Sequence, residues 1–213
     1  MNQSALLPRR HFAVLIAAAS LAFPQLAAAG FPPGSDITGR LPDLAFDMTR
    51  SSDGKRVTAA GYRGKVVVLF FGFTRCPDVC PLTVHNMAMI LQRMGPLAGE
   101  MRFLFITIDL AHDTLPRLKR FLANFGPPPE IDGLHGTPAE LAALAKRYYV
   151  QYQAPSGPNS PDPVSKITHI SCIYVFGPHG RVRYLVNDFA GSNLDFAAMT
   201  AGFDRLAKAA REP

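Results

Sequence analysis

Two cysteines, Cys76 and Cys80, are the residues whose type and spacing most directly suggest chemistry. The apolar run Val66 to Phe71 precedes them, and a helix-like segment, Leu82 to Met94, follows. Each cysteine stands before a proline, which disfavours the helical conformation at the cysteine itself. We therefore predict that both lie in a loop, with Pro81 at the first helical position, where its missing N–H is not needed.

This placement suggests reactive thiols. Cys80 would lie at the positive end of the helix, which favours thiolate over thiol. Two accessible thiols of low pKa can close a disulfide or share one soft metal ion. A Cys-x-x-Cys would indicate ordinary thioredoxin-like redox chemistry, whereas the longer Cys-x-x-x-Cys spacing leaves disulfide chemistry open and makes room for a metal. Because the chain has three cysteines, at least one thiol has no partner within it.

A third metal ligand would come from one of six histidines. Four are expected to lie away from the cysteines, because they belong to an N-terminal leader, the far side of a helix, a loop and a turn: His11, His85, His135 and His179. His112 follows Asp109 at the end of a predicted strand and is able to approach the cysteines. His169 lies on a strand after a Pro-rich loop, residues 154–166. On that strand Cys172 is expected to face away from His169, as a buried apolar side chain.

Hydrophobic patterning predicts the elements that position these residues. Strands are predicted at Leu44–Met48, Arg56–Ala60, Val66–Phe73, Met101–Ile108, Ile167–Phe176 and Arg181–Val186. Helices are predicted at Leu82–Met94, Thr114–Phe125, Pro138–Tyr148 and Asn193–Ala209. The turn signal Ser51-Ser52-Asp53-Gly54 joins the first two strands into an N-terminal β-hairpin.

This order of elements indicates an α/β fold of the thioredoxin-like type. Crossover helices imply parallel strands at the centre, and the final hairpin adds an antiparallel edge, so the central sheet is mixed and flanked by helices. Functional sites of such sheets gather at the carboxyl ends of the strands, where Cys76 and Asp109 fall.

Composition and the N-terminus define the domain organisation. Arg9 and Arg10, the apolar run Phe12–Phe23 and Ala27-Ala28-Ala29 make residues 1–29 a predicted secretory signal peptide. The alternative is an uncleaved membrane anchor formed by residues 12–29. Residues 30–40 are rich in Gly and Pro and predict a linker, which leaves residues 41–213 as one domain. The net charge of +6 is spread along the chain without a basic block, which argues against nucleic-acid binding.

The segment Phe70-Phe71-Gly72-Phe73-Thr74-Arg75-Cys76-Pro77-Asp78-Val79-Cys80-Pro81 resembles the signature of the Sco/SenC family, which are copper-binding assembly factors of cytochrome c oxidase. The resemblance covers roughly Leu41 to Leu206. It continues through Ile106-Thr107-Ile108-Asp109, Asp113-Thr114, Gly133-Leu134-His135-Gly136-Thr137 and Tyr174-Val175-Phe176-Gly177-Pro178-His179-Gly180.

The resemblance implies a thioredoxin-like copper-binding domain whose metal ligands are Cys76, Cys80 and His169. This chain departs from the family pattern at two places. Thr168 stands where an aspartate usually precedes the histidine, which removes an expected partner of the metal ligand. Leu110-Ala111-His112 stands where Pro-Glu-Arg is usual, which leaves room for a local role of His112.

Two thiolates and one imidazole are a soft ligand set that favours Cu(I) and also accepts Cu(II). Zinc is the main inorganic alternative. We therefore expect a periplasmic copper chaperone that delivers copper to the oxidase subunit carrying the CuA centre. Other periplasmic copper carriers and thiol reductants are further expected partners. The alternative function is a thiol-disulfide oxidoreductase that keeps the copper-site cysteines of the oxidase reduced, which needs Cys76 and Cys80 as a redox-active pair but not His169.

Overall fold

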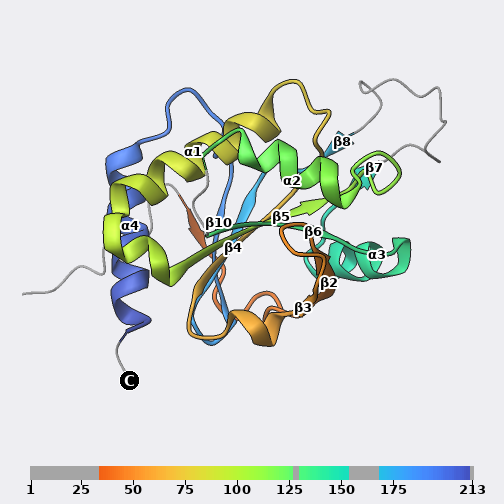
Figure 1. The fold of residues 1–213 in the computed structure, drawn as a ribbon. Coiled ribbons are helices and arrows are strands. Elements are labelled where there is room, and N and C mark those ends of the chain that lie inside the picture. The colour runs from red at the N-terminus through yellow and green to blue at the C-terminus, as the bar shows by residue number, and fades with distance from the viewer. Residues whose placement is uncertain (1–33, 127–129, 154–167, 212–213) are drawn as a thin grey trace, which may run out of the picture.

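A computed structural model describes residues 34–126, 130–153 and 168–211 of the chain (Figure 1). The predicted signal peptide or anchor and the Pro-rich loop at residues 154–166 lie outside the described residues. The strands are β1 Ser35–Asp36, β2 Asp47–Arg50, β3 Arg56–Thr58, β4 Val66–Gly72, β5 Met101–Thr107, β6 Ile131–His135, β7 Tyr152–Gln153, β8 Thr168–His169, β9 Ile173–Phe176 and β10 Val182–Val186. The α-helices are α1 Val79–Met94, α2 Leu115–Ala123, α3 Pro138–Arg147 and α4 Phe196–Ala209, and short 3-10 helices are η1 Ala59–Tyr62 and η2 Gly95–Glu100.

The described strands form one mixed sheet in the order β1-β10-β9-β4-β5-β6-β2-β3, with β7 and β8 as a separate pair. β4, β5 and β6 run parallel, whereas β9 pairs antiparallel with β4. Helices α1, α2 and α4 gather over one side of the sheet and α3 over the other (Figure 1). This is the thioredoxin-like layout that the sequence predicts, and the N-terminal hairpin is confirmed by the antiparallel pairing of β2 with β3.

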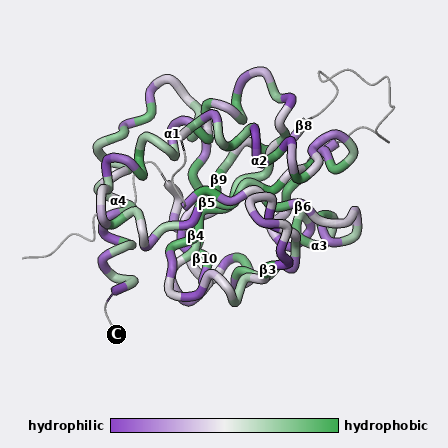
Figure 2. The backbone as a smooth tube through the Cα atoms, viewed as in Figure 1, coloured by the Kyte–Doolittle hydropathy of each residue, from purple (hydrophilic) through white to green (hydrophobic). Residues whose placement is uncertain are grey.

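The central strands are apolar because both of their faces are covered. Every residue of β4 and of β9 is buried, and hydrophobic residues concentrate along the middle of the fold (Figure 2). Phenylalanine rings fill much of this core, including Phe70, which contacts Phe103 and Phe105 on β5. The strand that leads into the cysteine loop is therefore rigidly held on both sides.

Strand β6 is absent from the predicted order of elements. Its sequence, Ile-Asp-Gly-Leu-His, is short and contains two residues that are poor strand formers. Gly133 has a packing reason: a Cβ atom there would lie 2.6 Å from Leu118 Cγ on α2. The close approach of α2 to β6 therefore requires glycine at this position. Because glycine is a poor strand former, the sequence pattern did not predict a strand here.

Several predicted boundaries are wrong. The first strand of the hairpin, predicted at Leu44–Met48, is β2 Asp47–Arg50. The predicted strand Ile167–Phe176 is divided, among the described residues, into β8 and β9. Helix α1 begins at Val79, so Cys80 lies in its first turn rather than in the preceding loop. A proline is tolerated there because the first backbone N–H groups of a helix have no intrahelical partner in any case.

Polar residues cap α3 and α4, and α4 begins at Phe196 rather than at the predicted Asn193. Thr137 and Glu140 form a reciprocal capping box at α3. Asp195 accepts a hydrogen bond from the N–H of Ala198 and caps α4. The predicted linker, residues 30–40, is described from residue 34 onward, and Ser35–Asp36 within it pairs with β10 as strand β1.

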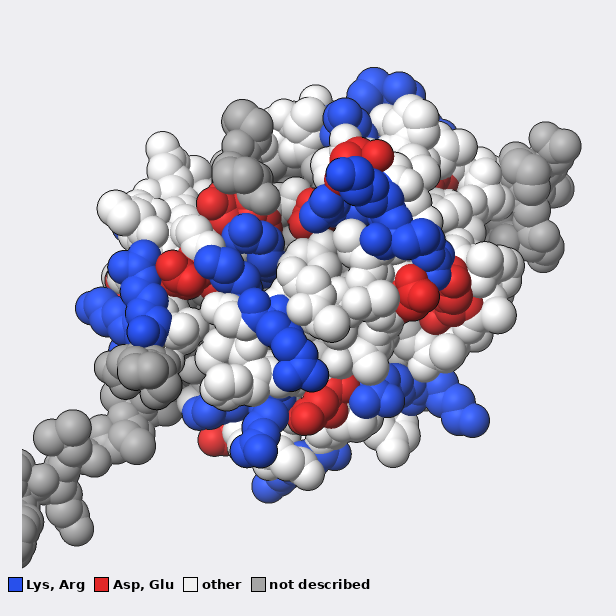
Figure 3. Space-filling model, turned by 60° about the horizontal axis from the view of Figure 1, so that its bottom comes forward, with Lys and Arg blue, Asp and Glu red and all other residues white. Residues whose placement is uncertain are grey.

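Charged groups are intermixed on the face shown in Figure 3, where Lys and Arg side chains lie among Asp and Glu. Representative pairs are Arg56 with Asp47 at 2.6 Å and Lys65 with Glu100 at 3.0 Å. Among the described helices, none combines the length and apolar character needed to cross a bilayer.

Candidate metal centre

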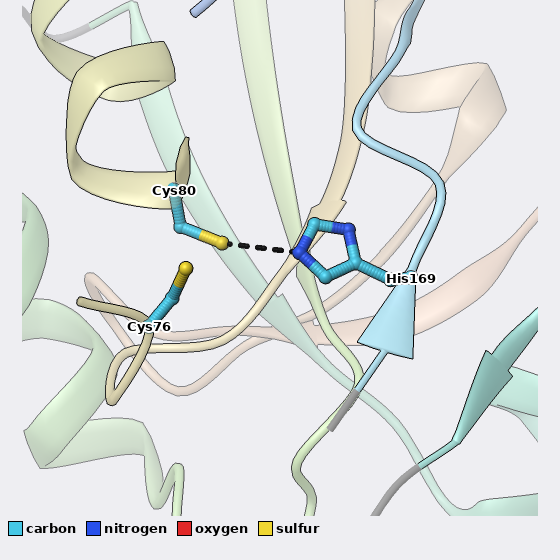
Figure 4. A group of neighbouring side chains, drawn as sticks. All are labelled: Cys76, Cys80 and His169. Carbon is cyan, nitrogen blue, oxygen red and sulfur yellow. Dashed lines mark hydrogen bonds between the residues drawn. The ribbon is translucent and has the colours of Figure 1, made fainter. Parts of the chain in front are cut away.

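The two cysteines occupy different positions around the end of β4. Cys76 lies in the loop after the strand, where its N–H donates to the carbonyl of Phe73 at 3.3 Å, and it is partly exposed. Cys80 lies in the first turn of α1 and is completely buried. The sulfur atoms of both face the same point in Figure 4. The expectation of two accessible thiols is therefore wrong for Cys80.

His169 approaches from the opposite side, on β8 (Figure 4). Two aromatic rings meet its imidazole edge to face, Phe70 at 5.9 Å and Phe73 at 5.8 Å between ring centroids. The backbone of His169 pairs with Tyr152 of β7. The ring is thus fixed by the core strand on one side and by a separate two-stranded ribbon on the other.

The hydrogen bonds of His169 define its tautomer. Its Nδ1 lies 3.1 Å from the carbonyl oxygen of Ile170, which can only accept, so Nδ1 carries the proton. Nε2 then presents a lone pair toward Cys80 Sγ, 3.4 Å away. The backbone carbonyl of Ile170 therefore orients the His169 ring, a role for which the family pattern has an aspartate before the histidine.

These three side chains are the one group of potential metal ligands found among the described residues, and their donor atoms all lie within 4.8 Å of one another. A first-row metal ion with bonds of about 2.3 Å to sulfur and about 2.0 Å to nitrogen holds its ligands roughly 3.5 to 4 Å apart. Two sulfurs and a neutral imidazole nitrogen form the soft set that copper prefers. The residues present therefore fit a copper ion without a large rearrangement.

The cysteines have opposite electrostatic environments. A hydrogen bond from Cys80 holds the pKa of Cys76 well below that of an ordinary thiol. The same hydrogen bond, followed by burial, raises the pKa of Cys80. The prediction that the helix end makes Cys80 a thiolate is wrong, because the loss of hydration and the neighbouring sulfur outweigh the helix dipole. Cys76 is the thiolate of the apo pair.

The other candidate residues lie elsewhere. Cys172 is buried and does not belong to the ligand group. It lies between β8 and β9, so the alternation of side chains along one continuous strand does not explain its position. His85 and His179 are exposed. His135 was expected in a loop, but it ends β6, where it is half-buried and its Nε2 donates to the carbonyl of Leu110 at 3.2 Å.

A polar network beneath the cysteine loop escaped the sequence analysis. Asp113 accepts the backbone N–H of Thr74 at 2.9 Å and the hydroxyl of Thr107 at 2.6 Å. Asp109 accepts the Arg75 guanidinium at 2.7 Å. His112, the alternative ligand, instead contacts Asp109 through Nδ1 at 2.8 Å. The available signal was the recurrence of polar residues after the apolar part of β5, at Thr107, Asp109 and Asp113, beside the carboxyl end of β4.

Comparison with known proteins supports the assignment suggested by these residues. A sequence model of the SCO1/SenC family matches residues 42–202. The human mitochondrial SCO1 homologue is 32% identical over 150 residues, which is 70% of this chain and 47% of that protein. The mitochondrial SCO2 of Saccharomyces cerevisiae is 31% identical over 151 residues, 70% of this chain and 48% of that protein. The chain thus spans about half the length of these relatives.

Two solved structures with copper bound have a similar fold. ScoI of Bradyrhizobium japonicum is 30% identical with a TM-score of 0.66, covering 77% of this chain and 98% of that one. Yeast Sco1 is 29% identical with a TM-score of 0.66, covering 78% of this chain and 90% of that one. With its family signature, its fold and its gathered Cys-Cys-His group, the chain belongs to the SCO1/SenC family.

Proposed function

We propose that this protein is a copper chaperone that holds copper through Cys76, Cys80 and His169 and delivers it to the oxidase subunit carrying the CuA centre. The observation that supports it is the convergence of two sulfurs and one imidazole nitrogen within 4.8 Å. Copper-bound structures of similar proteins support the choice of metal. A structurally similar Sco protein is described as a cytochrome c oxidase assembly protein, which supports an oxidase subunit as the client.

The unequal burial of the ligands suits delivery. Cys76 and His169 are partly exposed, so an incoming ligand from the client can replace either of them, while buried Cys80 still holds the ion. The proton on Nδ1 of His169 keeps Nε2 free for the metal. Stepwise ligand exchange of this kind avoids releasing free copper.

A second function is favoured by the asymmetry of the thiols. The Cys76 thiolate can attack a disulfide of the client and form a mixed disulfide, releasing one client thiolate. Cys80, after losing its proton, then attacks Cys76 and releases the second client thiolate. The client gains two electrons, and the protein is left with a Cys76–Cys80 disulfide that an external thiol must reduce. This cycle does not use His169.

The two functions are separated by comparing His169→Ala and Cys76→Ser with the wild type. His179→Ala is the control, because that histidine is exposed in a turn. Each protein is assayed for Cu(I) affinity, for disulfide exchange with a small thiol, and for oxidase assembly in cells that lack the native protein. We expect His169→Ala to bind Cu(I) much more weakly and to fail in assembly while retaining thiol exchange, and Cys76→Ser to lose all three.

Full assembly by His169→Ala without bound copper would instead make disulfide reduction the essential activity. Loss of assembly by the His179→Ala control would show that the assay does not report on the site.

We also propose that residues 1–29 act as a signal peptide or, through residues 12–29, as an anchor, and that residues 41–213 form the copper-binding domain in the periplasm after a linker at 30–40. The support is the residue pattern of the N-terminus, with Arg9-Arg10 before an apolar run and an A-x-A site before Gly30. N-terminal sequencing of the exported protein should find Gly30 at or near the start. An intact Met1 in the membrane fraction would assign the segment as an anchor.

A further inference from the structure

The residue before the first cysteine is tied to a buried carboxylate. Arg75 donates from Nε at 3.0 Å and from Nη2 at 2.7 Å to Oδ2 of Asp109, which is completely buried at the end of β5. The other carboxylate oxygen, Oδ1, lies 2.8 Å from Nδ1 of His112. Because a buried carboxylate is costly without partners, this arrangement strongly favours one position of the Arg75 side chain.

The next residue toward the strand is held in the same way. Thr74 donates its backbone N–H and its hydroxyl to Asp113, which is also buried and accepts the hydroxyl of Thr107. Two consecutive loop residues are therefore bound to two aspartates of the segment that follows β5. Cys76 comes directly after them in the chain.

Cys76 itself is held by contacts within the loop and with its neighbours in the site. The backbone N–H of Cys76 makes a turn contact with Phe73 O at 3.3 Å. Arg75 adjoins Cys76 and links this part of the loop to the end of β5, and it keeps 22% of its side chain exposed. Its two contacts with Asp109 therefore restrain the loop directly beside Cys76.

We propose that Arg75 is a positioning residue for the metal centre: by binding Asp109, with His112 on the opposite carboxylate oxygen, it fixes the loop so that the Cys76 sulfur stays opposite Cys80 and His169. This inference rests on the proposed copper-binding function. It assigns to Arg75 a role in ligand geometry and none in contact with the metal.

The test compares Arg75→Gln and Arg75→Lys. Arg50→Gln is the matched control, since Arg50 forms an ion pair with Asp53 and lies 3.9 Å from buried Asp132, away from the ligand group. Thermal unfolding reports stability, Cu(I) competition reports affinity, and the sulfur-to-Cu(II) charge-transfer spectrum reports ligand geometry. Iodoacetamide labelling of the reduced apo protein, located by mass spectrometry, reports the freedom of Cys76 without any metal.

For Arg75→Gln we expect a copper affinity lower by roughly 10- to 100-fold, as found when groups that orient metal ligands are removed. We also expect an altered charge-transfer spectrum and a changed labelling rate of Cys76. Arg75→Lys keeps the charge beside Asp109 but not the two-nitrogen contact. Its copper affinity, spectrum and Cys76 labelling rate should therefore lie between those of Arg75→Gln and the wild type. Arg50→Gln should change stability alone.

The labelling result separates this inference from the proposed function. If the wild type binds no copper, the chaperone proposal fails, yet Cys76 labelling still tests the position of the loop. Wild-type affinity, spectrum and labelling in Arg75→Gln would overturn the inference, as would equal effects in Arg50→Gln. If Arg75→Gln does not fold, Arg75→Lys decides: unchanged labelling and spectrum in that variant count against the inference.

Discussion

At the scale of single residues, similar side chains have different roles because their surroundings differ. Three cysteines share one chemistry, but Cys76 is a partly exposed thiolate, Cys80 a buried thiol beside it, and Cys172 a buried thiol whose pKa is raised by burial. Cys76 and Cys80 share a group of potential metal ligands with His169, and Cys172 lies outside that group. Reactivity follows from these neighbours rather than from the residue type.

Cys172→Ser should leave the copper stoichiometry unchanged, because the Cys172 sulfur lies outside the ligand group. The substitution places a hydroxyl where an apolar thiol is 4% exposed, so unfolding should become easier by about 1 to 3 kcal/mol. Metal analysis and urea unfolding check the two parts. A large loss of copper from a folded variant would return Cys172 to the list of ligands.

The ligands could be identified from the sequence, whereas their supports could not. Cys76 and Cys80 stand in one recognisable motif, and His169 follows from its place in the family pattern. The partner of His169, the carbonyl of Ile170, leaves no trace in the sequence because every residue has a carbonyl. The contact between Arg75 and Asp109 joins positions 34 apart, and only the parallel pairing of β4 with β5 brings them together.

At the scale of elements, close packing between α2 and β6 explains why strand β6 was missing from the predicted fold. β6 joins β5 to the N-terminal hairpin, and it depends on a glycine that lets α2 approach. The central strands were predictable because burial on both faces makes them continuously apolar. A short strand with a polar residue and a glycine has no such pattern.

Gly133→Ala should therefore destabilise the fold. The added methyl group would meet Leu118 Cγ at 2.6 Å and Ser51 Oγ at 2.7 Å, and overpacking of this kind costs about 1 to 3 kcal/mol. Gly99→Ala is the control, since its Cβ would have nothing within 4 Å. Urea unfolding compares the two, and equal stability of both variants would contradict the packing explanation.

The same strand carries a group that should make stability depend on pH. Burial raises the pKa of Asp132, which accepts a hydrogen bond from Tyr62 at 3.1 Å. On acidification the folded state binds this proton before the unfolded state does, so stability relative to Asp132→Asn should rise as the pH falls from 7 to 4. Urea unfolding of both proteins at the two pH values measures the difference.

Glu140→Gln gives the opposite sign as a control. The Arg56 guanidinium lowers the pKa of Glu140 to about 2, so the unfolded state binds this proton first and the wild type should lose relative stability on acidification. Identical pH dependence for Asp132→Asn and Glu140→Gln would show that burial does not control the titration of Asp132.

At the scale of the whole molecule, the metal centre joins parts of the chain that the sheet alone does not connect. Cys80 and His169 are 89 positions apart, and β8 pairs with β7 rather than with the central sheet among the described strands. Aromatic contacts from Phe70 and Phe73 hold His169 in place. An ion bound by all three ligands would add a direct link between this ribbon and the end of β4.

Copper should therefore stabilise the protein as a whole and β8 in particular. A ligand at about 100 times its dissociation constant stabilises the folded state by about 2.7 kcal/mol. For a domain of this size that corresponds to an increase of roughly 5 to 10 °C in Tm.

In His169→Ala the two sulfurs can still hold Cu(I), but the link to β8 is lost, so we expect a smaller increase. Amide hydrogen exchange should slow at Tyr152 and His169 on loading of the wild type but not of the variant. Thermal unfolding and hydrogen exchange under reducing, oxygen-free conditions measure both effects. An equal Tm increase in the two proteins, without added protection of β8, would mean that His169 does not bind the ion.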